Sequence, residues 1–184
     1  MAPILQSMPT DGALPPDTKD WTWVLDRVCP ECGFDARTID RHDIAPMIRR
    51  DAAAWEEQLA RPDVGVRTRP DRWSVLEYGC HVRDVYELYD RRLALMMGED
   101  DPLFENWDQD ATALERDYAS DDAVEVSMAL RKRASRLAER FDGVQGLDWD
   151  RRGRRSDGAR FTVESFGVYL VHDPAHHLSD ARQL

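Results

Sequence analysis

The stretch His172-Asp173-Pro174-Ala175-His176-His177 lies near the C-terminus, in a segment with helical spacing at 162–181. Residues four apart lie one above the other on a helix, so His172 and His176 present two imidazoles on one face. His81 lies in a separate helical segment and supplies a third imidazole. Three such ligands would bind a metal ion and leave coordination positions open. The same spacing also fits histidines on a solvated face, so the pattern alone leaves both interpretations standing.

Further helices are predicted from the spacing of apolar residues and from capping signals. The clearest start is the capping box formed by Ser74 and Glu77. Helices are expected at 44–59, 74–97, 121–141 and 162–181. The acidic segment 99–117 is too long for a tight antiparallel turn, so it predicts a crossover between parallel or non-adjacent helices. Residues 143–160 are expected to form a loop or short hairpin, and Pro174 is expected to bend the last helix.

These segments predict an all-α protein built as a four-helix bundle with a long crossover connection. The bundle is expected to span 44–184 as a single domain, with an irregular N-terminal arm at 1–43. Residues 1–19 contain four of the ten prolines, which disfavours regular structure there. The stretch 21–25 is expected to lie extended across an apolar groove. Cys29-Pro30-Glu31-Cys32-Gly33 follows as a tight turn that packs on the bundle.

The Cys29-x-x-Cys32 pair admits three interpretations. It looks like half of a zinc knuckle, but a structural zinc needs four ligands and there is no second CxxC, so Cys80 and His42 would have to complete the site. It also fits a redox-active dithiol. The default interpretation is a buried turn whose small cysteines pack well. The pair is expected to lie outside the catalytic ligands.

The composition limits the classes of partner. A formal net charge of −11 over 184 residues argues against nucleic acid, because phosphate binding needs a surplus of basic groups. The sequence has no signal-peptide pattern and no run of ~18 apolar residues, so we expect a cytoplasmic protein with no membrane partner. The three cysteines favour thiols or metal ligands over a disulfide framework. We expect a small-molecule substrate and leave the oligomeric state open, a homodimer included.

The order of motifs resembles the DinB-like superfamily, which includes the YfiT-type metal-dependent hydrolases and the metal-binding domain of mycothiol-dependent maleylpyruvate isomerase. Trp73-Ser74 leading into Glu77 and His81, and His172-x-x-x-His176 in the last helix, carry the resemblance. The likeness extends from the first expected helix to the C-terminus. It implies a four-helix bundle that holds a divalent metal at one end.

Carried over to this sequence, the resemblance implies that His81, His172 and His176 are the metal ligands. Some members use a carboxylate in place of one histidine, but histidine stands at all three matching positions here. His177 lies about 100° around the helix from His176 and is expected outside this ligand set. By ligand type the metal is expected to be zinc or nickel, with iron and manganese as the alternatives.

Other polar residues are candidates for supporting roles. Asp84, one turn after His81, and Asp173 or Asp180, near the other two histidines, are candidates to orient a ligand or to act as a base. Most aspartates, however, are simply solvated. An arginine cluster in the loop after the third helix is either solvated or forms an anion-binding rim for a cofactor. Its members are Arg151, Arg152, Arg154 and Arg155.

The function predicted from these observations is metal-dependent activation of a nucleophile. Likeness to mycothiol-dependent enzymes favours transfer or isomerisation with a low-molecular-weight thiol bound as thiolate. The nearest alternative is hydrolysis by activated water with the same ligands. A non-catalytic protein that binds a metal or a small ligand is the alternative from another class.

Overall fold

The computed structural model describes residues 20–184, so the predicted irregular segment 1–19 lies outside the described residues. Its helices are α1 (Ile44–Leu59), α2 (Val75–Gly98), α3 (Gln109–Glu115), α4 (Ala123–Asp142) and α5 (Val163–Ala181). Its strands are β1 (Leu103–Phe104), β2 (Arg152–Arg155) and β3 (Arg160–Thr162). Each of the four long helices begins and ends within two residues of its predicted bounds.

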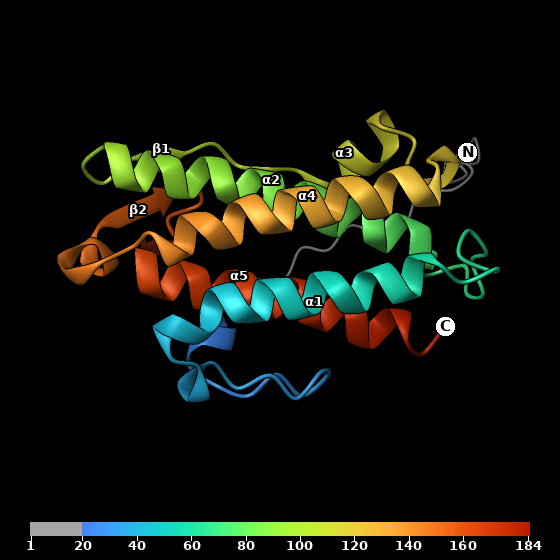
Figure 1. Cartoon of the computed structure of the whole chain (residues 1–184), viewed down its shortest axis with the longest axis horizontal. Coiled ribbons are helices and arrows are strands. Elements are labelled where there is room, and N and C mark those ends of the chain that lie inside the picture. The colour runs from blue at the N-terminus through green and yellow to red at the C-terminus, as the bar shows by residue number, and fades with distance from the viewer. Residues whose placement is uncertain (1–19) are drawn as a thin grey trace, which may run out of the picture.

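The four long helices lie side by side as a bundle (Figure 1). Helix α4 packs against α1 and α2, and α5 packs against the same two helices. Because α2 and α4 run in the same direction, the chain between them returns along the length of the bundle (Figure 1). The predicted four-helix bundle with a long crossover is therefore confirmed. Within residues 20–184, no helix is both long and apolar enough to span a lipid bilayer.

The crossover, residues 99–122, contains structure that the sequence analysis did not predict. It holds β1, α3 and the short 3₁₀ helix η4 (Tyr118–Ser120). Strand β1 pairs in parallel with β2, with Leu103 opposite Arg154. Strand β2 pairs with β3 as an antiparallel hairpin, with Gly153 opposite Phe161. The hairpin confirms the prediction for 143–160, and the added β1 ties the crossover to it.

The part of the arm that the structure describes is made of short 3₁₀ helices. They are η1 (Trp21–Leu25), η2 (Ala36–Thr38) and η3 (Arg41–Asp43), and a further one, η5 (Gly146–Asp150), follows α4. The prediction that 21–25 is extended was wrong, because the Asp20 side chain accepts a hydrogen bond from the Thr22 backbone N–H and caps a helical turn. All three arm helices contact α5.

Helix α5 is held in place by the bundle core at the stretch that carries the candidate ligands. It continues through Pro174, although proline lacks the N–H of a helical hydrogen bond. The fully buried Trp55 of α1 donates a hydrogen bond from its indole Nε1 to the backbone carbonyl of Pro174, at 3.2 Å. Together with the packing of α5 on α1, α2 and the arm, this contact sets which faces of α5 turn toward α2 and toward the arm.

Candidate metal centre

Helix α5 carries two pairs of polar side chains with i, i+4 spacing, offset by one residue. His172 pairs with His176, and Asp173 pairs with His177. Successive helical residues are about 100° apart, so the two pairs lie on neighbouring faces. Residues 20–184 accordingly contain two groups of ligand-type side chains. They are the pocket group, His81, Asp173 and His177, and the arm group, Cys29, Cys32, His172 and His176.

The pocket group brings donors from α2 and α5 to one point. One ligand atom from each of its three residues lies within 4.8 Å of the others. His81 Nε2 is 3.3 Å from Asp173 Oδ1, and His177 Nε2 is 3.9 Å from the same oxygen. The rings of His81 and His177 meet edge to face, with centroids 4.7 Å apart. The geometry is that of donors facing a common centre.

Buried polar atoms in the pocket group lack the partners that such atoms normally have. Three buried atoms, both ring nitrogens of His81 and Oδ1 of Asp173, have no hydrogen-bond partner among the described residues. The 3.3 Å contact between His81 Nε2 and Asp173 Oδ1 is an ion-pair distance without hydrogen-bond geometry. An unsatisfied buried polar atom costs about 1–3 kcal/mol. Two imidazoles and one carboxylate form a ligand set that divalent metals accept. The residues of the pocket group therefore fit a divalent ion.

The surroundings fix the charge and the orientation of these donors. Burial by itself would raise the pKa of Asp173, but His81 and His177 stabilise the carboxylate and hold its pKa well below the ordinary value. Asp173 is therefore an anion at neutral pH. Trp107 stacks on the His81 ring with centroids 5.5 Å apart, and Trp73 lies 5.3 Å from the same ring. The two indoles restrict the orientation of the imidazole.

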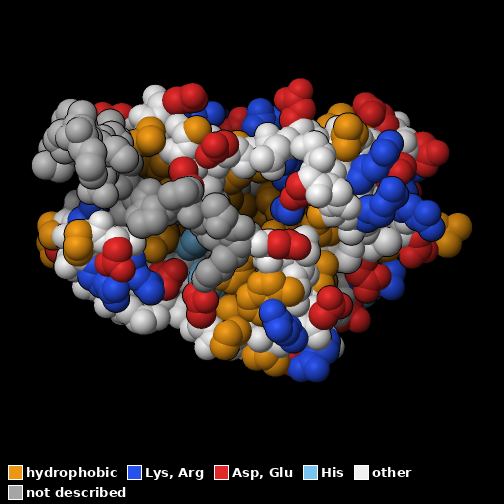
Figure 2. All heavy atoms as spheres, turned by 180° about the vertical axis from the view of Figure 1, so that it is seen from behind, with side chains coloured by type: hydrophobic (Ala, Val, Ile, Leu, Met, Phe, Trp, Pro, Cys, Tyr) orange, Lys and Arg blue, Asp and Glu red, His pale blue; other side chains and the backbone are white. Residues whose placement is uncertain are grey.

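A cavity of about 680 Å³ opens beside Asp173 and His177. Seen from behind the view of Figure 1, the surface is hollowed over hydrophobic side chains, and a histidine is visible near the hollow (Figure 2). The wall of the cavity combines aromatic rings with two arginines. It also includes His172 and His176 of α5 and several aspartates. Further lining residues are Trp107, Tyr89, Tyr169, Arg92, Arg155 and Asp157. The cavity gives a small molecule access to the pocket group.

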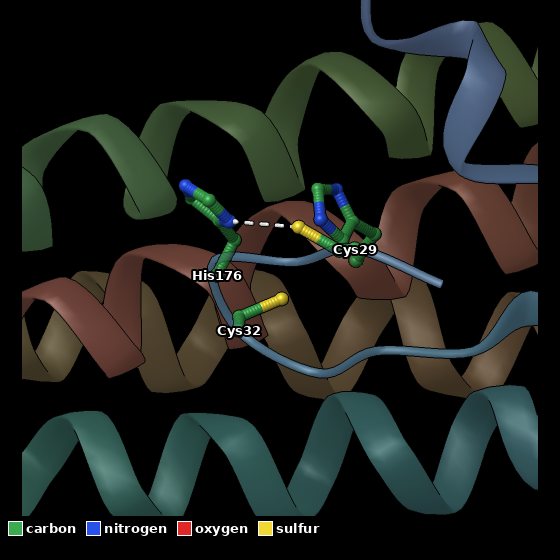
Figure 3. Close-up of side chains that lie close together, drawn as sticks. Cys29, Cys32 and His176 are labelled. Carbon is green, nitrogen blue, oxygen red and sulfur yellow. Dashed lines mark hydrogen bonds between the residues drawn. The ribbon is translucent and has the colours of Figure 1, made fainter. Parts of the chain in front are cut away.

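The arm group joins the tight turn of the arm to the other face of α5. Figure 3 shows the Cys29 sulfur directed at the His176 ring, with Cys32 on the same loop, and the distance from Cys29 Sγ to His176 Nδ1 is 3.7 Å. Both cysteines are free thiols. Burial, with a contribution from His176, lowers the pKa of His172 to about 4, so its imidazole is neutral at pH 7. Burial also raises the pKa of the Cys32 thiol to about 11.

The structure divides the three histidines that were predicted to share one ion. His81 lies with Asp173 and His177, whereas His172 and His176 lie with the two cysteines of the arm turn. The physical reason is the rotation of α5 about its axis, which turns the Asp173 and His177 face toward α2. Asp173, expected beside the ligands, is itself one of the three converging donors.

His177 is the residue that the sequence reasoning placed outside the site. A signal for it was present, because Asp173 and His177 repeat the i, i+4 spacing one residue further on. The link between the cysteines and the histidines also had a signal. CxxC together with HxxxH is the ligand spacing of two-Cys, two-His zinc sites, here with 139 residues between Cys32 and His172.

Asp84, predicted as a base or an orienting residue, lies in neither ligand group. Its carboxylate accepts hydrogen bonds from Tyr118 Oη at 2.6 Å, from Arg133 Nη1 at 2.6 Å and from Arg116 Nη1 at 3.0 Å. Arg83 Nε donates a further one at 3.0 Å. Since both carboxylate oxygens are occupied by these donors, Asp84 holds α2 to α4 and the crossover.

Of the four arginines predicted to bind a cofactor, Arg155 lines the cavity. Arg151 instead donates a hydrogen bond to the backbone carbonyl of Met96 at 2.6 Å. Arg154 forms an ion pair with an aspartate of the crossover, and Arg152 is exposed. Strand alternation along β2 and its pairing with β1 separate these side chains, so they do not form a common rim.

The comparisons with known proteins agree with this fold. YfiT from Bacillus subtilis, described as a probable metal-dependent hydrolase with an unusual four-helix bundle topology, superposes with a TM-score of 0.70. The match covers 79% of this chain and 89% of that chain at 17% sequence identity. No curated protein sequence matches the chain. Residues 35–181 match the family described as the DinB superfamily. Because this match spans most of the sequence, the chain belongs to the DinB superfamily.

Proposed function

We propose that the protein is a metal-dependent enzyme in which His81, Asp173 and His177 hold a divalent ion that activates water for hydrolysis of a small anionic substrate. One observation carries the proposal: buried donors without hydrogen-bond partners, on His81 and Asp173, converge with His177 at the edge of an open cavity. A ligand cluster with one buried and two half-buried members beside a cavity of about 680 Å³ suits chemistry on a bound molecule. The description of YfiT as a probable hydrolase supports the same reaction class.

The ligand set favours water over a thiol as the nucleophile. Two imidazoles and one carboxylate are the protein ligands of several zinc hydrolases, and they leave at least one coordination position open. A divalent ion in such a set supplies Lewis acidity that brings the pKa of water toward about 7. The Asp173 carboxylate reduces the net charge of the loaded site from +2 to +1, which weakens the attraction for a thiolate. The site predicted from the sequence, with three neutral histidines, would keep the full +2 charge and would attract a thiolate more strongly.

Two arginines support an anionic substrate. Arg92 is buried, and burial lowers the pKa of its guanidinium from the ordinary value. Arg155 donates a hydrogen bond to Tyr169 Oη at 3.3 Å and stays charged, because burial is outweighed by its pairing with Asp157. Guanidinium groups recognise carboxylates and phosphates through paired hydrogen bonds. In this proposal they bind the anionic group of the substrate, in addition to their contacts with the Glu105 carbonyl and with Asp157, while the reacting bond lies near the pocket group.

The hydrolysis proposal predicts metal-dependent cleavage of small anionic esters by the purified protein. We expect turnover of a panel of aryl carboxylate and phosphate esters that falls by about 100-fold or more in His81→Ala, because the activated nucleophile is lost with the ion. Initial rates measured with and without added metal test this. Cys80→Ser, which removes a buried thiol outside both ligand groups, should keep the full rate. Equal rates in His81→Ala and the unaltered protein would refute the proposal.

Thiol transfer is the second candidate, because Arg92 and Arg155 suit the carboxylate of a polar thiol cofactor as well as that of an anionic ester. It predicts that a low-molecular-weight thiol binds the open metal face as thiolate. Addition of mycothiol or a simpler thiol to cobalt-loaded protein would then raise the sulfur-to-cobalt charge-transfer absorption above its thiol-free level. The increase should vanish in His177→Ala. No increase at about millimolar thiol, beside clear ester cleavage, excludes this candidate.

A further inference from the structure

We propose that the arm group, Cys29, Cys32, His172 and His176, is a second metal site, a four-coordinate structural zinc site that fastens the N-terminal arm to α5. Its ligand residues are separate from those of the pocket group, although both groups use α5 and His172 and His176 also line the cavity. Its ligands come from two segments that are far apart in the sequence and that meet in the fold (Figure 3).

The arm turn is built to present two sulfurs to one point. The Cys29 backbone N–H donates to the Phe34 carbonyl, and the Gly33 N–H donates to the Cys29 carbonyl, each at 2.8 Å. Gly33 has a φ of +77°, a conformation in which glycine is free of Cβ strain. The chain therefore closes tightly around Cys32, and both sulfurs face α5 (Figure 3).

The distances agree with tetrahedral coordination. Zinc lies about 2.3 Å from a thiolate sulfur and about 2.0–2.1 Å from an imidazole nitrogen, so a tetrahedral site separates sulfur from nitrogen by about 3.5 Å. The distance from Cys29 Sγ to His176 Nδ1 is 3.7 Å. All four ligand atoms lie within 4.8 Å of one another. Small side-chain rotations would bring all four onto one ion.

The burial of these residues points to a ligand at their centre. Cys29 is fully buried, and His172 is 4% exposed. The buried Nε2 atom of His172 has no hydrogen-bond partner among residues 20–184. Trp21 and Phe34 pack on the His172 ring, with centroids 5.7 Å and 5.2 Å away, and cover part of its surface. A buried imidazole nitrogen of this kind is satisfied when it binds a metal.

The outer partners of His176 fit the same interpretation. Its Nδ1 faces Cys29, while its Nε2 lies 3.6 Å from Asp180 Oδ2 and 3.6 Å from Glu31 Oε2. Histidine ligands commonly direct the second ring nitrogen toward a carboxylate, which fixes the tautomer. His176 thus has a donor side toward the sulfurs and a carboxylate side away from them.

The ligand set indicates zinc and a structural role. Four protein ligands complete a tetrahedron and leave no open position, which is typical of structural sites. Two thiolates and two neutral imidazoles balance the charge of a divalent ion, so the site can lie beside a charged pocket group. Cys80 and His42, once considered as partners of the arm cysteines, are outside the group, and the Cys80 thiol donates to Asp121 at 3.3 Å.

The test is the metal content of the full-length protein purified under reducing conditions in the presence of zinc. Elemental analysis should show about two ions per chain, one for each group. Cys29→Ser and Cys32→Ser should each lose about one ion and keep ester cleavage, and His172→Gln should lose the same ion. His81→Ala should lose the other ion and keep the arm zinc. Cys80→Ser is the matched control and should retain both.

A second measurement keeps the outcome independent of misfolding. In cobalt-loaded unaltered protein without added thiol, thiolate-to-cobalt absorption should be present, should remain in His81→Ala and should be lost in Cys29→Ser. Circular dichroism would show whether each variant is folded. A Cys29–Cys32 disulfide found by mass spectrometry in protein that binds no zinc would overturn the proposal. The proposal would also be overturned if replacement of His81, of His172 and of His176 each removed the same ion.

Discussion

Replacement of His177 by alanine is expected to release the ion of the pocket group, while replacement of His172 leaves that ion bound. A structural zinc site with four ligands is worth about 10–16 kcal/mol, so one ligand contributes roughly 3–4 kcal/mol. Loss of His177 should therefore weaken binding at the pocket group by about two to three orders of magnitude. Competition with a chromophoric chelator, followed by elemental analysis, measures this change.

The control for His177→Ala is His42→Ala, which removes one imidazole at a position outside both ligand groups. His42 lies in the arm, where its ring packs edge to face on Trp149 with centroids 6.2 Å apart. We expect unchanged affinity in this variant. Unchanged affinity in His177→Ala, combined with loss of the pocket ion in both His172→Ala and His176→Ala, would restore the three-histidine site inferred from the sequence.

The bundle could be predicted from the sequence because its signals are local. Ser74 and Glu77 form both hydrogen bonds of the predicted capping box, and α2 begins there. The length and acidic character of residues 99–117 predicted a crossover. The structure contains one, because α2 and α4 run in the same direction and the chain has to return between them (Figure 1). The spacing of apolar residues predicted the bounds of each long helix to within two residues. It could do so because each helix buries one apolar stripe against the same core.

The division of the α5 side chains between two ligand groups could not be predicted in the same way. His172, Asp173, His176 and His177 are all candidates by spacing, and only packing decides which face meets α2. That packing depends on distant contacts, such as the hydrogen bond from Trp55 to the Pro174 carbonyl. Prediction of the arm group failed for a related reason. Its two halves are separated by 139 residues, and each half alone has too few ligands for a structural zinc site.

Asp84 illustrates the same limit, because it lies one turn from His81 on α2 yet serves another purpose. Its partners Arg116 and Arg133 come from the crossover and from α4. Both segments are remote in the sequence. The spacing of Asp84 from His81 therefore suggested a catalytic role, whereas in the fold Asp84 pairs with arginines of the crossover and of α4.

Replacement of Asp84 by asparagine is accordingly expected to destabilise the fold by about 3 kcal/mol at pH 7. The Asp84 side chain is 5% exposed and that of Arg83 is 11% exposed, so the variant removes the more buried of the two carboxylates that pair with this guanidinium and leaves only Asp121. The partial exposure of Arg116 and Arg133 limits the loss. Urea denaturation measures the free energy of unfolding. Asp121→Asn, which removes a 34% exposed partner of the same Arg83, should cost no more than about 1 kcal/mol.

The pH dependence separates this ion cluster from a packing effect. Burial alone would raise the pKa of Asp84, but hydrogen bonds from Arg83 and Tyr118 lower it below the ordinary value. A carboxyl group with a lowered folded-state pKa stabilises the protein fully above its unfolded pKa of about 3.9, and this stabilisation is lost as the pH falls through the folded pKa. The difference in unfolding free energy between the unaltered protein and Asp84→Asn should thus be constant from about pH 8 to pH 5 and shrink below about pH 4. A difference that stays the same down to the lowest pH at which both proteins fold would show that the carboxylate charge contributes nothing and that asparagine acts through packing alone.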